Sequence, residues 1–482
     1  MRLEELFAGV EGVDTEGIAP CFDSEALDIT DDSRAVREGT VFVCIRGEHF
    51  DGHSYAEEAL QKGAVAIVTE RDMGLSRQAV AENSRRTYAR LASNWFGNPT
   101  GAFRLIGVTG TNGKTTTTKV IQRILTDAGE KIGLIGTNQN EVGEDVLPAG
   151  KTTPEPMELY GLFARMRDAG CTSVVMEVSS QALAQYRITG ERFAVAAFTN
   201  LTQDHLDYHK DMESYYRAKQ MLFSMAERAV VNMDDEFGVR LLSEVSCSVA
   251  TCSMRSKSAD YRAFYVRNAA KGIRYWLRFG RKAYRVTFAI PGLFNVLNSM
   301  QAAAVCVELG IPPKQVVESL IAFEGVPGRS EVIPTGKEFT VIRDYAHTPD
   351  GLLNILPSVR SYTKGKVICV FGCGGDRDRT KRPLMGEVAA RLSDLVIVTS
   401  DNPRSEDPDA IIDDVMPGVR LHPTEYLRVA DRREAIHRAL ALAKPGDTIL
   451  LAGKGHEDYQ VLKQGKVHFD EREIVLEALE KL

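Results

Sequence analysis

Residues 104–118 read RLIGVTGTNGKTTTT and combine an apolar strand-like run, a turn with two glycines and the start of a helical segment. Such a unit presents backbone N–H groups and the positive end of a helix to phosphate oxygens. Lys114 can neutralise the β- and γ-phosphates, and the Thr115 hydroxyl can bind Mg²⁺. Val108 stands where the common P-loop has its first glycine, so an ordinary kinase or GTPase loop is not predicted, and a plain glycine-rich turn is the alternative. The candidate triphosphate loop comprises Gly110, Thr111, Asn112, Gly113, Lys114, Thr115 and Thr116.

Strand-like and helical segments alternate along most of the chain, which is typical of α/β proteins with mostly parallel sheets. A chain of 482 residues is long for a single core, and two turn-rich breaks divide it further. We expect a small N-terminal α/β domain at 1–98, a central P-loop domain with a parallel sheet at 99–325, and a C-terminal Rossmann-like α/β domain at 326–482. Residues 254–290 are rich in aromatic side chains and arginine and predict antiparallel hairpins.

Composition and charge exclude several classes of protein. The net charge of −7 argues against a dedicated nucleic-acid binder, whose binding surface would be basic. The eight cysteines form no CxxC pair and no metal-ligand spacing, which is typical of reduced, buried thiols. The acidic start lacks the features of a signal peptide, and no run approaches the roughly 18 apolar residues that span a bilayer. We expect a soluble cytoplasmic protein without nucleic-acid partners or membrane insertion.

Two further segments carry candidate metal ligands. Glu177 ends a strand-like run, where acids beside a phosphate loop commonly hold Mg²⁺; a helix-capping surface acid is the alternative. His205 and His209 stand four residues apart, which would suit zinc on a helix, but no HExxH pattern is present. A single histidine near Mg²⁺ fits His205 better, with a structural role for His209. The pair Asn200 and Asp204 matches a guanine-reading motif only loosely, because its spacing is one residue too long.

Nearly the whole chain resembles the Mur ligases. The motifs follow the order of that family: TGTNGKTT (109–116), EVSS (177–180), TNLTQDH (199–205), YRAKQMLF (216–223), GLFNVLN (292–298), VPGRSE (326–331), DYAHTPDG (344–351) and GKGHE (453–457). The stretch DDSRAVREGTVFVCIRGEHFDGH (31–53) is similar to the UDP-binding N-terminal domain of one member. The resemblance implies an ADP-forming ligase that uses ATP and Mg²⁺ to activate a carboxylate as an acyl phosphate, which an amine then attacks.

Four residues receive catalytic roles from this resemblance: Lys114, Glu177, His205 and Lys219. Taken alone, Lys219 is an ordinary helix lysine, but the matching lysine of the family is carbamylated by CO₂. A carbamate exchanges an ammonium that repels metal ions for an anion that binds one. The implied metal ligands are Thr115, Glu177, His205 and carbamylated Lys219. Further implied ATP contacts are Asn295, at the adenine, and Arg329, Asp344 and His347, from the third domain.

The implied acceptor substrate is a UDP-N-acetylmuramoyl dipeptide, which spans the first two domains. Ser33 matches a UDP contact, with Glu48 and His49 as neighbours. The positions that match contacts to the pyrophosphate and the peptidyl-muramate are Thr152, Thr153, Ser179, Gln185 and Arg187. Taken alone, the turn at Thr152 and Thr153 could be an ordinary loop. Arg187 taken alone could be a surface charge.

The stretch DNPRSEDP (401–408) indicates which amino acid is added. Family members that add meso-diaminopimelate carry DNPR here, whereas lysine-adding members lack the arginine. Arg404 suits a bidentate contact to the extra carboxylate of diaminopimelate. Lysine lacks this carboxylate and would leave Arg404 without a partner, which can disfavour lysine by roughly 10⁴-fold. A plain helix start is the alternative. The other implied amino-acid contacts are Arg377, Asp401, Asn402, Pro403, Gly453 and Glu457.

Two other classes of function remain open at this point. One is a different Mur-type ligase, such as the D-alanyl-D-alanine-adding enzyme or a folylpolyglutamate synthetase, against which the DSR and DNPR motifs argue. The other is a non-enzymatic P-loop switch, which would not need the acceptor residues. A monomer is expected, with domain closure about the two linkers during turnover.

Overall fold

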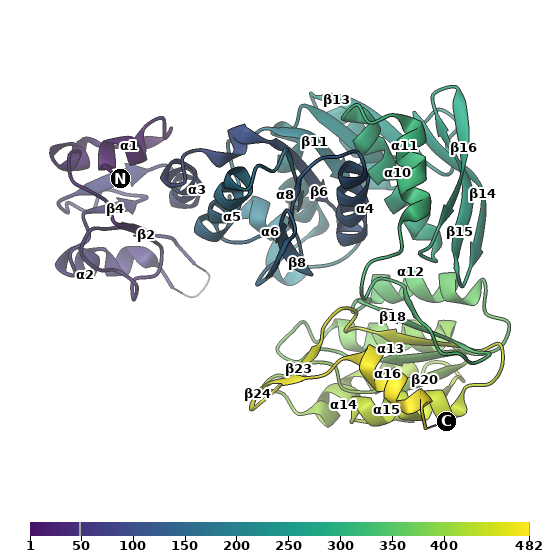
Figure 1. Cartoon of the computed structure of the whole chain (residues 1–482). Coiled ribbons are helices and arrows are strands. Elements are labelled where there is room, and N and C mark those ends of the chain that lie inside the picture. The colour runs from purple at the N-terminus through teal and green to yellow at the C-terminus, as the bar shows by residue number, and fades with distance from the viewer. Residues whose placement is uncertain (48–49, 482) are drawn as a thin grey trace.

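Three separate large β-sheets organise the chain in the computed structural model, which describes residues 1–47 and 50–481 (Figure 1). Each of the proposed domains, 1–98, 99–325 and 326–482, contains one of these sheets. The expected α/β class with mostly parallel sheets is confirmed. In the described part of the chain, no helix is long and apolar enough to cross a membrane.

The N-terminal domain is built on a five-stranded sheet. Its elements are α1 (Leu3–Phe7), β1 (Val13–Asp14), η1 (Glu16–Cys21), β2 (Asp28–Thr30), β3 (Thr40–Val43), η2 (Gly52–Tyr55), α2 (Ala56–Gln61), β4 (Ala66–Thr69), β5 (Gln78–Ala81) and α3 (Ser84–Trp95). The strand order is β1-β5-β4-β3-β2, and only the β1–β5 pair is antiparallel. Strands β3 and β4 are apolar runs buried along their whole length, as expected for central parallel strands.

An eleven-stranded sheet forms the central domain. Its elements up to the hairpins are η3 (Pro99–Ala102), β6 (Arg104–Thr109), α4 (Lys114–Asp127), β7 (Ile132–Ile135), β8 (Gln139–Val142), β9 (Asp145–Pro148), α5 (Pro156–Asp168), β10 (Ser173–Glu177), α6 (Ser180–Ala184), β11 (Phe193–Phe198), α7 (Leu206–His209), α8 (Met212–Ser224), β12 (Arg228–Asn232), α9 (Glu236–Glu244) and β13 (Ser248–Ser253). Strand β6 lies between β10 and β11 and is parallel to both. The candidate phosphate loop therefore opens at the carboxyl ends of adjacent parallel strands, where α/β proteins bind ligands.

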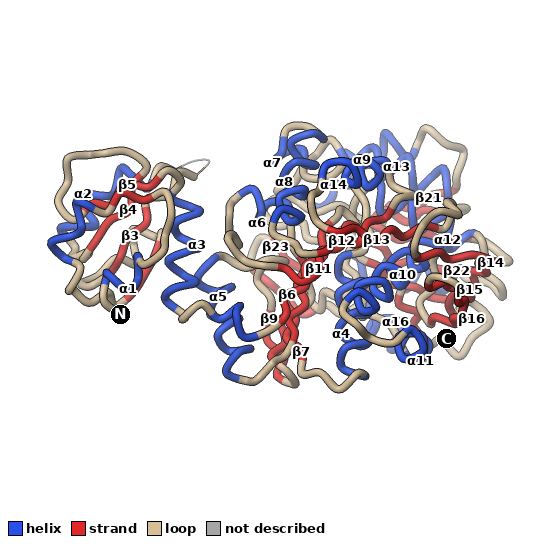
Figure 2. Tube along the Cα trace, turned by 90° about the horizontal axis from the view of Figure 1, so that it is seen from above, coloured by secondary structure: helices blue, strands red, loops and turns tan. Residues whose placement is uncertain are grey.

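Antiparallel hairpins extend this sheet, as the sequence predicts for residues 254–290. Strands β14 (Tyr261–Ala269), β15 (Gly272–Phe279) and β16 (Lys282–Phe288) pair in turn, and β16 forms the edge. Helices α10 (Leu293–Glu308) and α11 (Pro313–Ala322) then return to the sheet. In Figure 2, α4 and α10 lie on one side of the central strands and α8 lies on the other.

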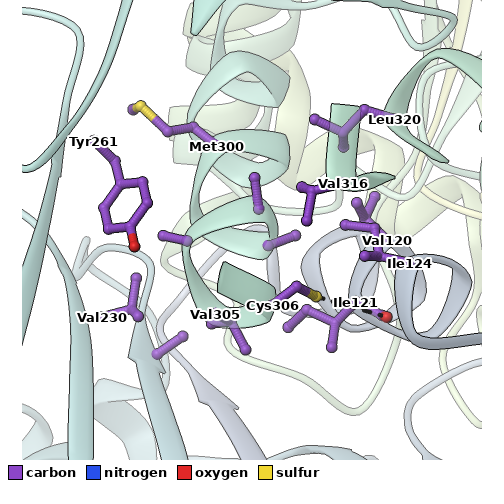
Figure 3. Close-up of a cluster of buried hydrophobic side chains, with 14 of the residues drawn as sticks. Val120, Ile121, Ile124, Val230, Tyr261, Met300, Val305, Cys306, Val316 and Leu320 are labelled. Atoms are coloured by element: carbon purple, nitrogen blue, oxygen red, sulfur yellow. Dashed lines mark hydrogen bonds between the residues drawn. The ribbon is translucent and has the colours of Figure 1, made fainter. Parts of the chain in front are cut away.

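The core that anchors the phosphate loop lies around α10 (Figure 3). Met300, Val305 and Cys306 on this helix are fully buried, and they pack among side chains of the sheet and of α4 and α11. The fully buried side chains labelled around them include Val120, Ile121, Ile124, Val230, Val316 and Leu320. Since α4 begins directly after the loop, this packing holds the loop between two rigid elements.

The C-terminal domain is a six-stranded sheet with helices on both faces. Its elements are β17 (Glu331–Ile333), β18 (Thr340–Asp344), α12 (Pro349–Arg360), β19 (Val367–Phe371), α13 (Lys381–Leu392), β20 (Leu395–Val398), α14 (Pro408–Val419), β21 (Glu425–Arg428), α15 (Arg432–Leu442), β22 (Thr448–Ala452), the hairpin β23 (Tyr459–Leu462) and β24 (Gly465–His468), and α16 (Glu471–Leu479). The order is β17-β18-β22-β19-β20-β21, and only β17 is antiparallel to its neighbour. Separate apolar clusters on the two faces match the Rossmann-like expectation.

Candidate active site

The loop between β6 and α4 requires glycine at two positions. Gly110 and Gly113 have φ angles of 145° and 88°, which L-residues rarely adopt. A Cβ atom on Gly110 would lie 1.9 Å from Thr199 Oγ1, and one on Gly113 would lie 2.3 Å from Asn298 Oδ1. The backbone therefore approaches its neighbours closely, and the amides of Thr111 and Asn112 donate to Asn200 O and Oδ1 at 2.9 and 3.0 Å. The loop ends at the N-terminus of α4, where a helix favours phosphate oxygens.

Two lysines converge on the carbonyl oxygen of Gly110. Lys114 Nζ donates to Gly110 O and Thr111 O at 2.9 Å each, and Lys219 Nζ donates to Gly110 O at 2.9 Å. The Lys219 side chain is 1% exposed and lies 4.6 Å from the Tyr215 ring centroid. Burial, together with the charge of Lys114, holds the pKa of Lys219 well below its ordinary value. The neutral amine form of Lys219 is therefore favoured relative to an exposed lysine.

Glu177 ends β10 beside the loop and is 1% exposed. Its Oε2 accepts hydrogen bonds from Thr115 Oγ1 at 3.1 Å and Thr137 Oγ1 at 3.0 Å, and its Oε1 accepts one from the Thr137 backbone at 2.9 Å. Among the described residues, no group of three or more His, Cys, Asp or Glu side chains could hold a metal ion. The carboxylate and hydroxyl pair fits Mg²⁺, which protein sites bind through one or two carboxylates together with substrate phosphates.

The two histidines of the TNLTQDHLDYH segment occupy different environments. His205 has a φ of 53°, its side chain is 44% exposed, and its Nε2 lies 3.4 Å from Asp204 Oδ2 at the cleft. His209 is buried, lies 2.9 Å from Ser180 Oγ through Nε2, and stacks on Tyr215 at 5.0 Å between centroids. His209 thus has packing contacts of the kind that a structural role requires.

A cleft of about 450 Å³ lies between the loop and the C-terminal domain. Arg329 Nη2 reaches across it and donates to Thr115 Oγ1 at 3.0 Å. Asp344 Oδ2 accepts from the Ser330 backbone at 2.6 Å, and burial raises the pKa of this carboxyl group. The lining includes every predicted residue of the loop from Thr111 to Thr116 and also Asn295, Arg329, Asp344 and His347. The residues assigned to ATP from two domains therefore meet around one cleft.

Sequence reasoning missed a direct link between these domains. Asp350 Oδ2 accepts from Asn112 Nδ2 at 2.6 Å and from Thr202 Oγ1 at 2.8 Å. This carboxylate lies in the first turn of α12 and contacts the phosphate loop itself. Its place in the DYAHTPDG motif was the available signal, but only the fold brings it to Asn112.

The predicted acceptor residues of the central domain form one hydrogen-bonded group. Thr153 Oγ1 donates to Glu177 O at 2.8 Å and accepts from the Ser179 backbone at 3.0 Å. Arg187 Nη1 donates to Thr153 O at 2.8 Å, and its Nη2 donates to Gln185 Oε1 at 2.7 Å. Thr152 Oγ1 joins the group through Thr137 Oγ1, 3.0 Å away. The predicted substrate residues are thereby linked to the strand end that carries Glu177.

The predicted UDP contacts belong to the N-terminal domain. Ser33 is half-buried, and its carbonyl oxygen accepts from Lys62 Nζ at 3.2 Å. The predicted contacts Glu48 and His49 lie outside the described residues. The UDP site therefore stays a prediction.

A second cleft of about 910 Å³ lies between the C-terminal domain and the segment with Asp204 and His205. The predicted amino-acid residues that line it are Arg377, Asp401, Asn402, Arg404, Gly453 and Glu457. Pro403 is buried, and a Cβ on Gly375 would lie 1.9 Å from the Pro403 carbonyl oxygen. Two loops, 372–379 and 401–407, thus pack closely to form this wall.

Arg404 has a left-handed backbone, with a φ of 53°. Its Nη1 donates to Gly375 O at 2.8 Å, and no ion pair joins it to a carboxylate within residues 1–47 and 50–481. The Asn402 side chain, by contrast, is held by two neighbours. Its Nδ2 donates to Glu457 Oε2 at 2.8 Å, and its Oδ1 accepts from Lys454 Nζ at 3.2 Å. An unusual backbone conformation held by surrounding contacts is a feature of functional sites. The Arg404 guanidinium is available to an anionic ligand.

Known families match three parts of the chain. Residues 28–93 match "Mur ligase family, catalytic domain", residues 108–306 match "Mur ligase middle domain", and residues 328–455 match "Mur ligase, glutamate ligase domain". Together these matches span most of the chain and fall in all three sheets.

Individual proteins match over nearly the full length. A UDP-N-acetylmuramoyl-L-alanyl-D-glutamate–2,6-diaminopimelate ligase of Clostridium tetani is 46% identical, with 94% of each chain covered. The solved structure of a ligase with the same name has a TM-score of 0.70 at 31% identity and covers 97% of this chain and 99% of its own. A folylpolyglutamate synthase of Mycobacterium tuberculosis, complexed with ADP, has a TM-score of 0.63 at 20% identity, covers 76% of this chain and 91% of its own, and shares the fold.

Proposed function

This chain belongs to the Mur ligase family and is an ATP-dependent amide ligase, and we propose that it adds meso-2,6-diaminopimelate to UDP-N-acetylmuramoyl-L-alanyl-D-glutamate. The single observation that carries the choice of amino acid is Arg404, whose guanidinium lines the larger cleft without an ion-pair partner in the described chain. Relatives named for this reaction, such as the Clostridium tetani ligase, support the same choice. The product would serve peptidoglycan precursor synthesis.

The proposed ATP site is the smaller cleft. Lys114 exchanges its two bonds to loop carbonyls for bonds to phosphate oxygens, and Arg329 and His347 reach the nucleotide from the C-terminal domain. Asn295 is 1% exposed and is held by Asn298 at 3.0 Å, which supports a fixed contact to the base. Mg²⁺ would be held by Thr115, Glu177 and His205, and it would supply neutralisation of phosphate charge.

Lys219 is proposed to be carbamylated. Its neutral amine attacks the carbon of CO₂, one N–C bond forms, and one proton leaves to solvent, so that a carbamate anion replaces the amine. The low pKa and the burial of Lys219 support this step, because an ammonium group has no lone pair with which to attack. The resulting anion would lie close to Lys114 and to the metal ligands.

The proposed reaction forms an amide in two balanced steps. An oxygen of the substrate carboxylate attacks the γ-phosphorus of ATP, and ADP leaves with the former bridging oxygen. The amine of diaminopimelate then attacks the acyl carbon, phosphate leaves, and the amine loses a proton. Arg187, Thr153 and Ser179 would orient the acceptor, and Arg404 and Arg377 would orient the amino acid. This mainly requires alignment and charge neutralisation from the protein.

The proposed working form is a monomer in the cytoplasm, where ATP and the UDP-linked acceptor would be supplied. Parallel reactions with ATP, Mg²⁺, the UDP-linked dipeptide and either meso-diaminopimelate or lysine test the function. We expect phosphate release and a product of the matching mass only with diaminopimelate. Preference for lysine would contradict the role of Arg404, and phosphate release without either amino acid would contradict amide formation.

A further inference from the structure

The outer strands of the central sheet concentrate positive charge that the ligase reaction does not use. Residues 261–291 contain no aspartate or glutamate, whereas the whole chain has a net charge of −7. No ion pair joins a cation of this segment to an acidic side chain in residues 1–47 and 50–481. The eight cations are Arg262, Arg267, Lys271, Arg274, Arg278, Arg281, Lys282 and Arg285.

The strand register places like charges directly opposite each other. Arg262 pairs with Arg278, and Arg267 pairs with Arg274, across the β14–β15 ladder. Like charges at such positions destabilise a sheet. Arg278 Nη2 is held by Lys257 O at 3.2 Å and Ala259 O at 2.6 Å, whereas Arg267 and Arg274 are exposed. An anion bound at the exposed pair would relieve its repulsion.

Aromatic rings lie among these charges. Phe264 pairs with Trp276 between the two arginine pairs, and Trp276 pairs with Arg285 on its other side. Trp276 is 41% exposed, while its strand neighbours Tyr275 and Leu277 are buried against the core. Arginines and aromatics therefore share the outer side of the hairpins, which we call the Arg–Trp face.

Tyr265 adds an exposed ring beside this face. It lies where the β14–β15 register shifts, with a φ of 51°, and it is 79% exposed. Bulges of this kind redirect a side chain. Strands β14, β15 and β16 lie at the far side of the molecule from the N-terminal domain (Figure 1), and neither of the two clefts described above includes their residues.

Protection of a sheet edge is a simpler explanation for part of the charge. Edge strands often carry cations that block pairing with other chains. This accounts for Lys282 and Arg285 on β16, which is the edge. It does not account for Arg274 and Arg278 on β15, which is paired with a strand on each side, nor for the exposed Trp276 between them.

We propose that the Arg–Trp face binds the anionic surface of a membrane as a peripheral contact. Arginine and lysine are attracted by anionic headgroups, and tryptophan and tyrosine favour the interface between water and hydrocarbon. The charges are spread over three strands and the two hairpin turns that join them, so they match a surface of many headgroups. Single-stranded nucleic acid also binds cationic and aromatic side chains, but in a groove that follows its backbone. Binding of an oligonucleotide is therefore the alternative outcome of the test below.

Vesicles provide the test, with the intact protein at low salt. We expect it to co-sediment with vesicles of phosphatidylglycerol and phosphatidylcholine but not with pure phosphatidylcholine. Arg274→Glu/Arg285→Glu should lower partitioning at least about 20-fold, since each cation near an anionic surface contributes several-fold. Arg274→Lys/Arg285→Lys should retain most binding. Lys337→Glu/Arg420→Glu changes the net charge equally at exposed sites elsewhere and should bind as the parent does.

Tryptophan fluorescence locates the contact. The chain has two tryptophans, Trp95 and Trp276, so Trp95→Phe leaves Trp276 as the only reporter. Its emission should shift to the blue with anionic vesicles alone, and ligase activity of the charge-reversed variant in solution should match the parent. Equal sedimentation of the two charge-reversed double variants would overturn the proposal. So would an unshifted Trp276 emission, or saturable binding of a single-stranded oligonucleotide that vesicles cannot displace.

Discussion

Arg382 holds both carboxylate oxygens of Glu406, with Nη1 3.0 Å from Oε2 and Nη2 2.8 Å from Oε1. The Arg382 side chain is 0% exposed and also donates to Gly374 O at 3.2 Å and to Asp414 Oδ2 at 2.8 Å. Glu406 in turn accepts from the Asp376 backbone at 2.6 Å. This pair joins the loop that carries Arg377 to the loop that carries Arg404, although Arg382 itself does not line the cleft.

Arg382→Lys should therefore raise the KM for the amino acid by roughly tenfold or more and leave the KM for ATP nearly unchanged. Lysine keeps the charge but cannot bind both oxygens in a planar fork. Arg382→Leu should also lower stability by about 1–3 kcal/mol, because it removes charge-assisted hydrogen bonds to two partly exposed carboxylates. Steady-state kinetics and denaturant unfolding measure both effects.

The exposed pair Arg433 and Glu477 is the matched control. Their side chains are 48% and 56% exposed, so Arg433→Ala should change stability by less than about 1 kcal/mol and leave both KM values unchanged. A folded Arg382→Lys variant with an unchanged amino-acid KM would show that the pair does not position the site.

Arg404→Ala should weaken use of diaminopimelate by roughly 10²–10⁴-fold in kcat/KM, because a charge-assisted contact to one carboxylate is lost. Discrimination against lysine should fall by a similar factor, and ATP binding measured by calorimetry should stay the same. Arg420→Ala, at an exposed position on another surface, is the control. If lysine were still rejected as strongly by Arg404→Ala, specificity would have to arise elsewhere.

Lys219→Met should abolish ligase activity and yet raise the melting temperature in CO₂-free buffer near neutral pH. The pKa of Lys219 is depressed in the folded state, so the unfolded chain binds more protons between the folded and unfolded pKa values. Stability therefore rises with pH over that window, and it is lost as pH falls. Methionine has no titratable group, so Lys219→Met removes the free-energy cost of burying the lysine. Scanning calorimetry of the parent and the variant, from neutral pH to about pH 9, should show a difference that shrinks as the pH rises.

Carbamylation makes a separate prediction for Lys219. Enzyme depleted of CO₂ should lose activity and regain it with bicarbonate, and ¹³C-labelled bicarbonate should give a carbamate resonance that Lys219→Met lacks. The exposed Lys314→Ala variant should keep both the resonance and the activity. Full activity under strict exclusion of CO₂ would contradict the carbamate.

Protonation of His456 should destabilise the C-terminal domain under mildly acidic conditions. Burial, reinforced by the charges of Arg329 and Arg343, lowers the pKa of His456 to about 4. The unfolded state binds the proton first, so stability should decline as pH falls from about 6.5 to about 4, by at most about 3 kcal/mol. His456→Gln should flatten this part of the pH profile of unfolding. An equally steep decline in the variant would assign the effect to other groups.

Motifs with local geometry could be predicted from the sequence alone. Gly110, Gly113 and Lys114 occupy the strand–turn–helix unit that their spacing indicates, because φ preferences and helix starts depend on near neighbours. The α/β class and the hairpins after residue 254 follow from apolar periodicity for the same reason.

Electrostatic interactions between residues far apart in the sequence could not be predicted from local patterns. The sequence indicates that Lys219 lies on a helix, but its depressed pKa arises because the fold buries it beside Lys114 and against Gly110 O, 109 positions away. Asp350 likewise reaches Asn112 only when two domains meet. Buried charge, cleft shape and contacts between domains depend on the sum of the tertiary packing, which no short stretch of residues encodes. Local backbone chemistry thus determined the loop and the fold class, and the assembled domains decided which side chains share a site.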